Sequence, residues 1–220
     1  MDIKTLFNLS YGLYVIGAKD GERNVGCVVN TVTQATATPV TLTVCINKDN
    51  YTNACIKKTK EFAVSILSEA AKENTIAVFG FSSSKDRDKF ANIPYGLAPS
   101  PYIKEGVTGY LQCKVINFID HFTHTIFIAE VTEAENILNA QGSLETPMTY
   151  AYYHKVIKGK TPKNASSYVA EEKEAVKAEG SYKCDICGYI YTGSKEEFEK
   201  LPDDYQCPIC RVPKNMFKPL

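Results

Sequence analysis

The sequence predicts a mainly β protein: a β-barrel with peripheral helices, followed by a small metal-holding domain. The first two-thirds of the 220-residue chain contain several segments with strand-like patterns. Residues 169–180 then form a charged run with several alanines and no aromatic residue, which is typical of a linker. After this run, two Cys-x-x-Cys pairs lie close together. We therefore divide the chain into a large domain (1–168), a linker (169–180) and a small domain (181–220).

The strands of the barrel are predicted from β-branched residues and from alternating apolar and polar side chains. The predicted strands are 24–32, 40–46, 61–67, 107–118 and 125–132. The last segment has apolar residues on both faces, with Ile126 and Ile128 on one and Phe127 and Ala129 on the other. A strand buried on both sides suits a closed barrel with something packed outside it. Short helices are predicted over 50–58 and 72–79.

Composition and charge exclude several classes of protein. The 25 Lys and Arg residues balance 25 Asp and Glu residues, which argues against a dedicated binder of nucleic acid or anionic membranes. No apolar run is long enough to span a bilayer, and the N-terminus lacks the features of a signal peptide. We therefore expect a cytoplasmic protein, in which the scattered cysteines at 27, 45, 55 and 113 are free thiols.

The paired cysteines predict a metal site. Cys184 and Cys187 form the first pair, and Cys207 and Cys210 form the second. Each pair can place two thiolates on one tight turn, and two facing turns give a tetrahedral sulfur cage. A segment this short buries too little surface to fold reliably alone, so the metal supplies stability. The cage suits zinc or a single iron, and thiolates alone do not decide between them.

The residues around these cysteines resemble rubredoxins. The resemblance lies in the C-x-x-C-G-Y-x-Y pattern at 184–191, in D-D-x-x-C-P-x-C at 203–210 and in the ending at 212–217. It implies one iron bound by four cysteines that exchanges single electrons. Three features depart from the family: a shorter loop between the pairs, Arg211 in place of the usual Gly, and the absence of Trp. The small core would then consist of Tyr182, Tyr189, Tyr191, Phe198 and Phe217. A structural zinc ribbon is the alternative.

Two segments of the large domain suggest a cofactor site. There is no G-x-G-x-x-G motif, so a Rossmann site is unsupported. Residues 30–34 instead end a predicted strand with polar groups, and residues 45–52 end the next strand and open a helix. The start of this helix, with Lys48 and Thr52 nearby, suits a phosphate, although Asn50 or Thr52 is equally suited to be an ordinary N-cap. Together the two segments suit a planar polar ring and a phosphate.

The large domain resembles the flavin reductase-like, FMN-binding split-barrel family over roughly residues 1–168. The resemblance rests on segments 30–34, 44–48, 60–67 and 123–131, and residues 150–163 look like the ending of one branch of the family. It implies an isoalloxazine edge lined by Asn30, Thr31, Val32 and Thr33. It also implies a phosphate held by Asn47, Lys48, Asn50 and Thr52. FMN is favoured over FAD.

Other residue roles follow from the same resemblance. Arg87 and Lys89 would touch the phosphate or a nicotinamide nucleotide, and His124 would lie near the nicotinamide and the flavin. Cys45 faces the flavin or is a small buried filler, which is the commoner fate of a free cysteine. An isolated histidine such as His124 is otherwise usually an ordinary surface residue. Members of the family are generally homodimers with the flavin near the subunit interface.

As a whole, the chain resembles the high-molecular-weight rubredoxins. This implies that NADH or NADPH reduces FMN, that the flavin passes electrons singly to the iron, and that the iron reduces a flavodiiron protein. A flavin or ferric reductase that releases its product is an alternative. A non-enzymatic flavin-binding barrel with a structural zinc ribbon for protein docking is another.

Overall fold

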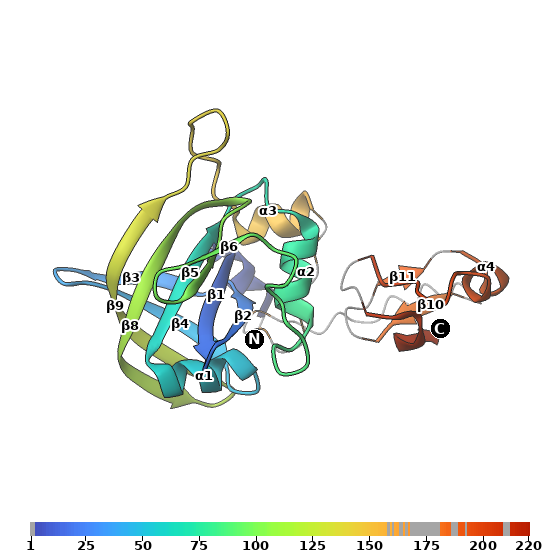
Figure 1. The fold of residues 1–220 in the computed structure, drawn as a ribbon, viewed down its shortest axis with the longest axis horizontal. Coiled ribbons are helices and arrows are strands. Elements are labelled where there is room, and N and C mark those ends of the chain that lie inside the picture. The colour runs from blue at the N-terminus through green and yellow to red at the C-terminus, as the bar shows by residue number, and fades with distance from the viewer. Residues whose placement is uncertain are drawn as a thin grey trace.

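The computed structural model comprises a barrel and a small C-terminal unit (Figure 1). It describes residues 3–157, 159, 161–162, 165, 167, 181–185, 189–191, 193–208 and 212–220. Within these residues, no helix has the length and apolar character needed to cross a membrane. The predicted linker at 169–180 lies outside the described residues.

One antiparallel sheet curves around the core and makes the barrel (Figure 1). Its seven strands are arranged in the order β2-β1-β5-β8-β9-β4-β3. They are β1 (Tyr14–Asp20), β2 (Arg23–Val29), β3 (Val32–Ala37), β4 (Val40–Asn47), β5 (Glu61–Leu67), β8 (Val107–His121) and β9 (His124–Asn136). The short strands β6 (Tyr95–Leu97) and β7 (Pro101–Ile103) pair separately. The mainly β prediction is confirmed.

The predicted strand 24–32 is corrected by the structure. It divides into β2 and β3, because the chain bends at Asn30 and leaves the first strand. Asn30 therefore follows the end of β2, where its side chain can point into the protein and is not constrained by strand pairing.

Two apolar clusters fill the barrel part. The first lies inside the sheet, where the side chains of Ile16, Val44, Phe62 and Phe127 are completely buried. Helix α1 (Tyr51–Thr59) contributes its buried face to this cluster. The second cluster joins helix α2 (Glu73–Phe81) and helix α3 (Tyr150–Lys155) to the other side of the sheet, and a 3-10 turn, η1 (Ile3–Asn8), precedes β1. The helices are thus peripheral, as predicted.

The two faces of β9 differ in burial. Phe127 and Ala129 are completely buried, whereas Ile126 and Ile128 on the other face are only half-buried. The predicted two-sided apolar strand is present, but within a single chain its outer face is only partly covered. A half-covered apolar face leaves room for a second surface to pack against it.

The small unit is a three-stranded sheet with one short helix. Its strands are β10 (Tyr182–Cys184), β11 (Ile190–Tyr191) and β12 (Phe217–Pro219), with β10 in the centre. Helix α4 (Lys195–Glu199) begins with a capping box between Ser194 and Glu197, and a 3-10 turn, η2 (Lys214–Met216), precedes β12. The predicted aromatic core is confirmed, and Tyr182 stacks on Phe198 with ring centroids 3.9 Å apart.

Candidate functional site

A cavity opens between the rim of the barrel, α2 and α3. Its volume is about 670 Å³, counting the space that is open to solvent. Its lining combines apolar side chains of β2 and α2 with polar side chains from several chain segments. The lining residues are Leu13, Val28, Val29, Asn30, Cys45, Ile46, Asn47, Asn50, Ile76, Phe79, Gly80, Phe81, His124, Tyr150, Tyr153, Thr161, Pro162, Ala165 and Ser167.

The cavity brings together five of the residues predicted for cofactor binding or catalysis: Asn30, Cys45, Asn47, Asn50 and His124. The sheet explains this grouping, because β4 pairs with β9 so that Asn47 lies opposite His124. Asn30 follows the end of β2 and is 7% exposed. Residues that end or begin strands on one rim of a barrel therefore meet around one opening.

His124 lies at the start of β9, where the side chain can face the cavity. Burial lowers the pKa of its imidazole below the usual value, so the ring favours the neutral form at pH 7. Its Nδ1 lies 2.8 Å from the hydroxyl of Thr123. A neutral imidazole can donate or accept a hydrogen bond near a bound ring without adding charge.

The N-terminus of α1 reaches the cavity through Asn50. The Asn50 side chain accepts a hydrogen bond from the backbone N–H of Thr52 at 3.1 Å, so Asn50 is the N-cap of the helix. It also lines the cavity. The two sequence interpretations of Asn50 are therefore compatible, because the cap places the positive end of a nine-residue helix at the rim.

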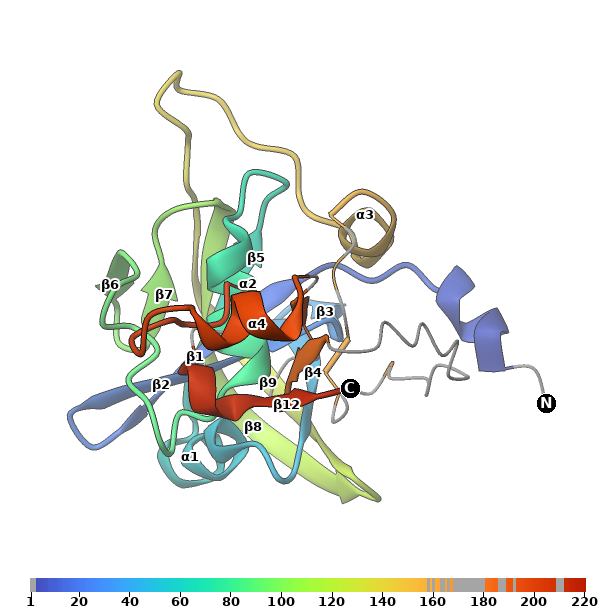
Figure 2. The same ribbon diagram turned by 90° about the vertical axis from the view of Figure 1, so that its right-hand side faces the viewer.

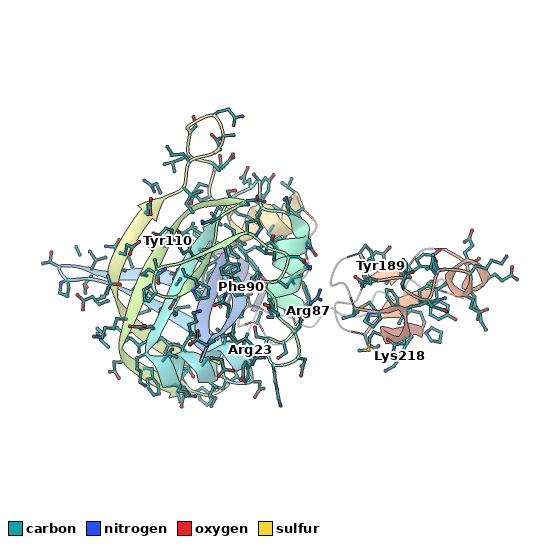
Figure 3. All side chains as sticks on the ribbon, in the orientation of Figure 1. Arg23, Arg87, Phe90, Tyr110, Tyr189 and Lys218 are labelled. Carbon is teal, nitrogen blue, oxygen red and sulfur yellow. The ribbon has the colours of Figure 1, made fainter. Side chains whose placement is uncertain are left out.

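Several predicted residues lie away from the cavity lining. Thr31 donates its hydroxyl to the carbonyl of Cys45, while Val32 and Thr33 lie on the largely exposed strand β3. Lys48 is exposed next to the opening, and Arg87 is half-buried (Figure 3 labels it beside α2). The described part of the lining therefore contains neither Lys nor Arg.

Thr52 differs from its predicted role. Its side chain is completely buried in the protein and does not line the cavity. It lies beside the thiol of Cys27, whose pKa is raised by burial to about 11. Thr52 therefore belongs to the packing of α1 against β2 rather than to a phosphate site.

Lys89 also differs from its predicted role. Its side chain is 3% exposed, and its ammonium donates to the carbonyls of Gly26 at 2.9 Å and Phe79 at 3.1 Å. Burial lowers its pKa to about 8. Since Phe79 lies near the C-terminus of α2, Lys89 fastens the end of this helix to β2 and cannot reach a phosphate.

A chain of polar groups in the cavity wall was missed by sequence reasoning. Asn30 donates to Ser167, and Ser167 donates to the hydroxyl of Tyr150. The Tyr150 hydroxyl is bonded in turn to Thr161. In the sequence, segment 150–163 only resembles the ending of one branch of the flavin reductase-like family. Serine, threonine and tyrosine in a tail carry no periodic signal, and only the fold brings them to Asn30.

The metal site is partly described. Cys184 and Cys207 are both 0% exposed and belong to the core of the small unit, whereas Cys187 and Cys210 lie outside the described residues. The first cysteine of each pair makes the same kind of backbone hydrogen bond. The N–H of Cys184 donates to the carbonyl of Tyr189, and the N–H of Cys207 donates to the carbonyl of Val212, each at 2.8 Å. Two equivalent turns with buried thiols suit a tetrahedral metal ion such as iron.

The cavity fits a flavin by the chemistry of its lining. An isoalloxazine ring has an apolar dimethylbenzene end and a polar pyrimidine end. The apolar side chains of Val28, Ile76 and Phe79 in the lining suit the first, and the amides of Asn30 and Asn47 suit the second. When bound, a flavin would accept a hydride and return electrons one at a time.

Comparisons with known proteins agree with this architecture. Residues 6–159 match the flavin reductase like domain, and residues 182–218 match the rubrerythrin, rubredoxin-like domain. The high molecular weight rubredoxin of Moorella thermoacetica is 40% identical over 99% of both chains. The ferric-chelate reductase (NAD(P)H) of Archaeoglobus fulgidus is 35% identical, over 76% of this chain and 98% of that protein.

A solved structure has the same fold. The NADH:FAD oxidoreductase SgcE6 of Streptomyces globisporus superposes with a TM-score of 0.55 at 24% identity, over 60% of this chain and 79% of that one. The chain therefore belongs to the flavin reductase-like family, as an NAD(P)H-dependent flavoprotein oxidoreductase of the type in which this domain is fused to a C-terminal rubredoxin-like domain.

Proposed function

We propose that the chain passes electrons from NADH or NADPH, through FMN held in the cavity, to one iron held by Cys184, Cys187, Cys207 and Cys210. A nicotinamide gives a hydride, which carries two electrons, while a single iron accepts one. A flavin can exchange electrons in both ways and therefore belongs between them. In this proposal Asn30, Cys45 and Asn47 contact the ring, and His124 lies beside the reacting nicotinamide.

The observation that carries this proposal is the position of Phe81 at the end of α2. This side chain lines the cavity and also packs against the core of the small unit, which contains Cys184 and Cys207. Figures 1 and 2 agree that the small unit lies beside α2. One aromatic residue thus contacts both the candidate flavin site and the metal unit, which favours electron transfer within one chain.

FMN is the flavin that we propose. The N-terminus of α1 lies at the rim through Asn50 and suits a single phosphate. The described lining has no Lys or Arg to balance the second phosphate of FAD. Lys48, exposed beside Asn47, is positioned to supply a charge at the opening.

We also propose a homodimer that forms through the outer face of β9 and its neighbours. Ile126 lies between Cys45 of β4 and Ile119 of β8 in the ladders, and Ile119 is 51% exposed. This apolar stripe reaches the cavity at Cys45. A second copy would cover the stripe and bring Thr31 and the first residues of β3, Val32 and Thr33, toward a flavin site. Sedimentation of the protein and of Ile119→Asp would test this, because a monomeric wild-type protein contradicts it.

The terminal acceptor that we propose is a flavodiiron protein that reduces oxygen or nitric oxide, on the strength of the family resemblance. Direct reduction of ferric chelates is a second candidate, favoured by the 35% identity to the ferric-chelate reductase. Oxidation of the reduced protein by each acceptor, measured under the same anaerobic conditions, distinguishes the two.

An anaerobic visible spectrum tests the internal pathway. Addition of NADH or NADPH should bleach flavin and ferric-thiolate bands together. Phe81→Ala should slow iron bleaching but not flavin bleaching, whereas Leu97→Ala, a change on the exposed β6, should alter neither. Stoichiometric zinc with no ferric bands would refute the iron pathway. Equal iron bleaching in Phe81→Ala would refute the role of this contact.

A further inference from the structure

A continuous chain of hydrogen bonds links the cavity to His154 on α3. Asn30 Nδ2 donates to Ser167 Oγ at 2.9 Å, and Ser167 Oγ donates to the Tyr150 hydroxyl at 2.8 Å. The Tyr150 hydroxyl is bonded to Thr161 Oγ1, which lies 3.2 Å from His154 Nε2. The first of these hydrogen bonds joins Asn30 and Ser167, which are 137 positions apart in the sequence.

The bonds of this chain can all point in one direction. Because the hydroxyl proton of Ser167 goes to Tyr150, the Tyr150 proton is available for Thr161, and the Thr161 proton for His154 Nε2. The imidazole then acts as the final acceptor and carries its own proton on Nδ1. A row of hydroxyls that donate in sequence is the arrangement through which a proton moves by successive transfers.

The two ends of this hydrogen-bond chain differ in their access to the cavity. Ser167, Tyr150 and Thr161 line the cavity, whereas His154 does not line it and is half-buried behind them. Burial lowers the pKa of the His154 imidazole, and a backbone hydrogen bond with Gly159 opposes this shift. Among the described residues, the titratable groups with rings packed on this imidazole are Tyr150 at 4.3 Å and Tyr153 at 5.2 Å.

The proposed electron transfer releases a proton, which such a hydrogen-bond chain can carry away. One reduced nicotinamide and two ferric ions give one oxidised nicotinamide, two ferrous ions and one proton. The hydride bond breaks at the flavin site, its two electrons leave to iron one at a time, and the proton stays behind in the cavity. Unless this proton leaves, every turnover adds a positive charge to a partly enclosed site.

We propose that Ser167, Tyr150 and Thr161 conduct this proton out of the cavity to His154, which releases it to solvent. Asn30 is a positioning residue in this scheme, because its amide fixes Ser167 but cannot relay a proton. The proposal rests on the proposed function and adds an acid–base role for residues in the tail of the barrel domain.

The test uses the full-length holoprotein with ferricyanide as the final oxidant and a pH-indicator dye in weak buffer. Tyr150→Phe and Thr161→Val each interrupt the chain while keeping side-chain size. Tyr152→Phe, which removes a hydroxyl from the same helix outside the chain, is the control. We expect the first two variants to lower kcat by about 100-fold with little change in KM, and the control to leave both unchanged.

Two further readouts separate proton transfer from a structural role. In the wild-type protein, kcat should fall as His154 is protonated at acidic pH and should decrease in D2O, and His154→Gln should lose the acidic limb. Added imidazole should restore part of the rate to His154→Gln. Since the chain has 3 histidines, long-range 1H–15N spectra can assign His154, and its Nε2 should be unprotonated in the wild type and shift in Thr161→Val.

The outcomes are distinguishable. If nucleotide bleaches neither flavin nor iron in the wild type, the proposed function fails. If both bleach but Tyr150→Phe and Thr161→Val retain the wild-type kcat, isotope effect and acidic limb, the hydroxyls only hold the tail in place and the proton pathway is wrong. A protonated Nε2 in the wild type would also overturn the direction of the chain.

Discussion

Replacement of Lys89 by methionine should change the pH dependence of stability in a defined direction. The ammonium is 3% exposed and has a pKa of about 8 in the folded protein, against 10.5 when free. Between these values the unfolded chain binds a proton that the folded chain does not, so stability rises with pH. Below pH 8 the folded protein bears the full cost of the buried charge, and above pH 10.5 this cost is gone.

The magnitude follows from these two pKa values. Between about pH 7.5 and 9.5, Lys89 alone should raise the free energy of unfolding by about 2 kcal/mol. The hydrogen bonds to Gly26 and Phe79 survive this titration, because a neutral amine still has two N–H groups for the two carbonyls. Lys89→Met has no titrating group at this position. The free energy of unfolding of the wild type relative to that of the variant should therefore rise by about 2 kcal/mol over this pH range.

Urea unfolding of both proteins at the two pH values measures this difference. Taking the difference between the proteins cancels titrating groups that do not interact with Lys89, such as Cys113, whose pKa is raised by burial to about 12. The wild-type midpoint should gain roughly 1 M urea over that of Lys89→Met on going to the higher pH. An equal difference in the free energy of unfolding at both pH values would refute the lowered pKa of Lys89 in the folded protein.

Three other changes have defined outcomes. Gly26→Ala should cost about 1–3 kcal/mol in thermal or urea unfolding, because its Cβ would lie 2.8 Å from Ile16 O and from the Phe79 ring, whereas Gly80→Ala, with no contact under 3.7 Å, should be neutral or stabilising. Asn50→Ala should cost about 1 kcal/mol through the lost cap of α1 and should weaken flavin binding, as measured by fluorescence titration. Cys184→Ser should abolish the ferric bands and unfold the small unit while the flavin spectrum is retained, and stoichiometric iron in this variant would contradict the metal assignment.

The barrel was predictable where single strands carry their own pattern. The predicted strand at 61–67 coincides with β5, and the prediction at 40–46 lies within β4. β1 was missed because its sequence includes Gly17, Lys19 and Asp20, which weaken any alternation. It is a strand because it lies between β2 and β5, and a Cβ on Gly17 would come within 1.9 Å of the Pro101 carbonyl. Such close packing depends on the partner strands and leaves no local signal.

The candidate site was predictable only in part for a similar reason. Asn30, Asn47 and His124 stand at strand ends, and polar groups in such positions are visible in sequence. The predicted role of Lys89 came only from the family resemblance, and its burial depends on how Gly26 and Phe79 fold around it. Tyr150, Thr161 and Ser167 have no local pattern, and the C-terminal tail reaches Asn30 only after the barrel has formed.

The position of Ser167 in the cavity wall has a consequence for the small unit. The chain runs from Ser167 through residues 168–180 to Ser181, where the small unit begins. A ligand that fills the cavity gains contacts with Thr161 and Ser167 and so holds the root of this connection at the rim. Binding of a ligand in the cavity and the ordering of Thr161 and Ser167 in its wall are therefore thermodynamically linked, so a ligand should protect this segment, which leads to the small unit, from local unfolding.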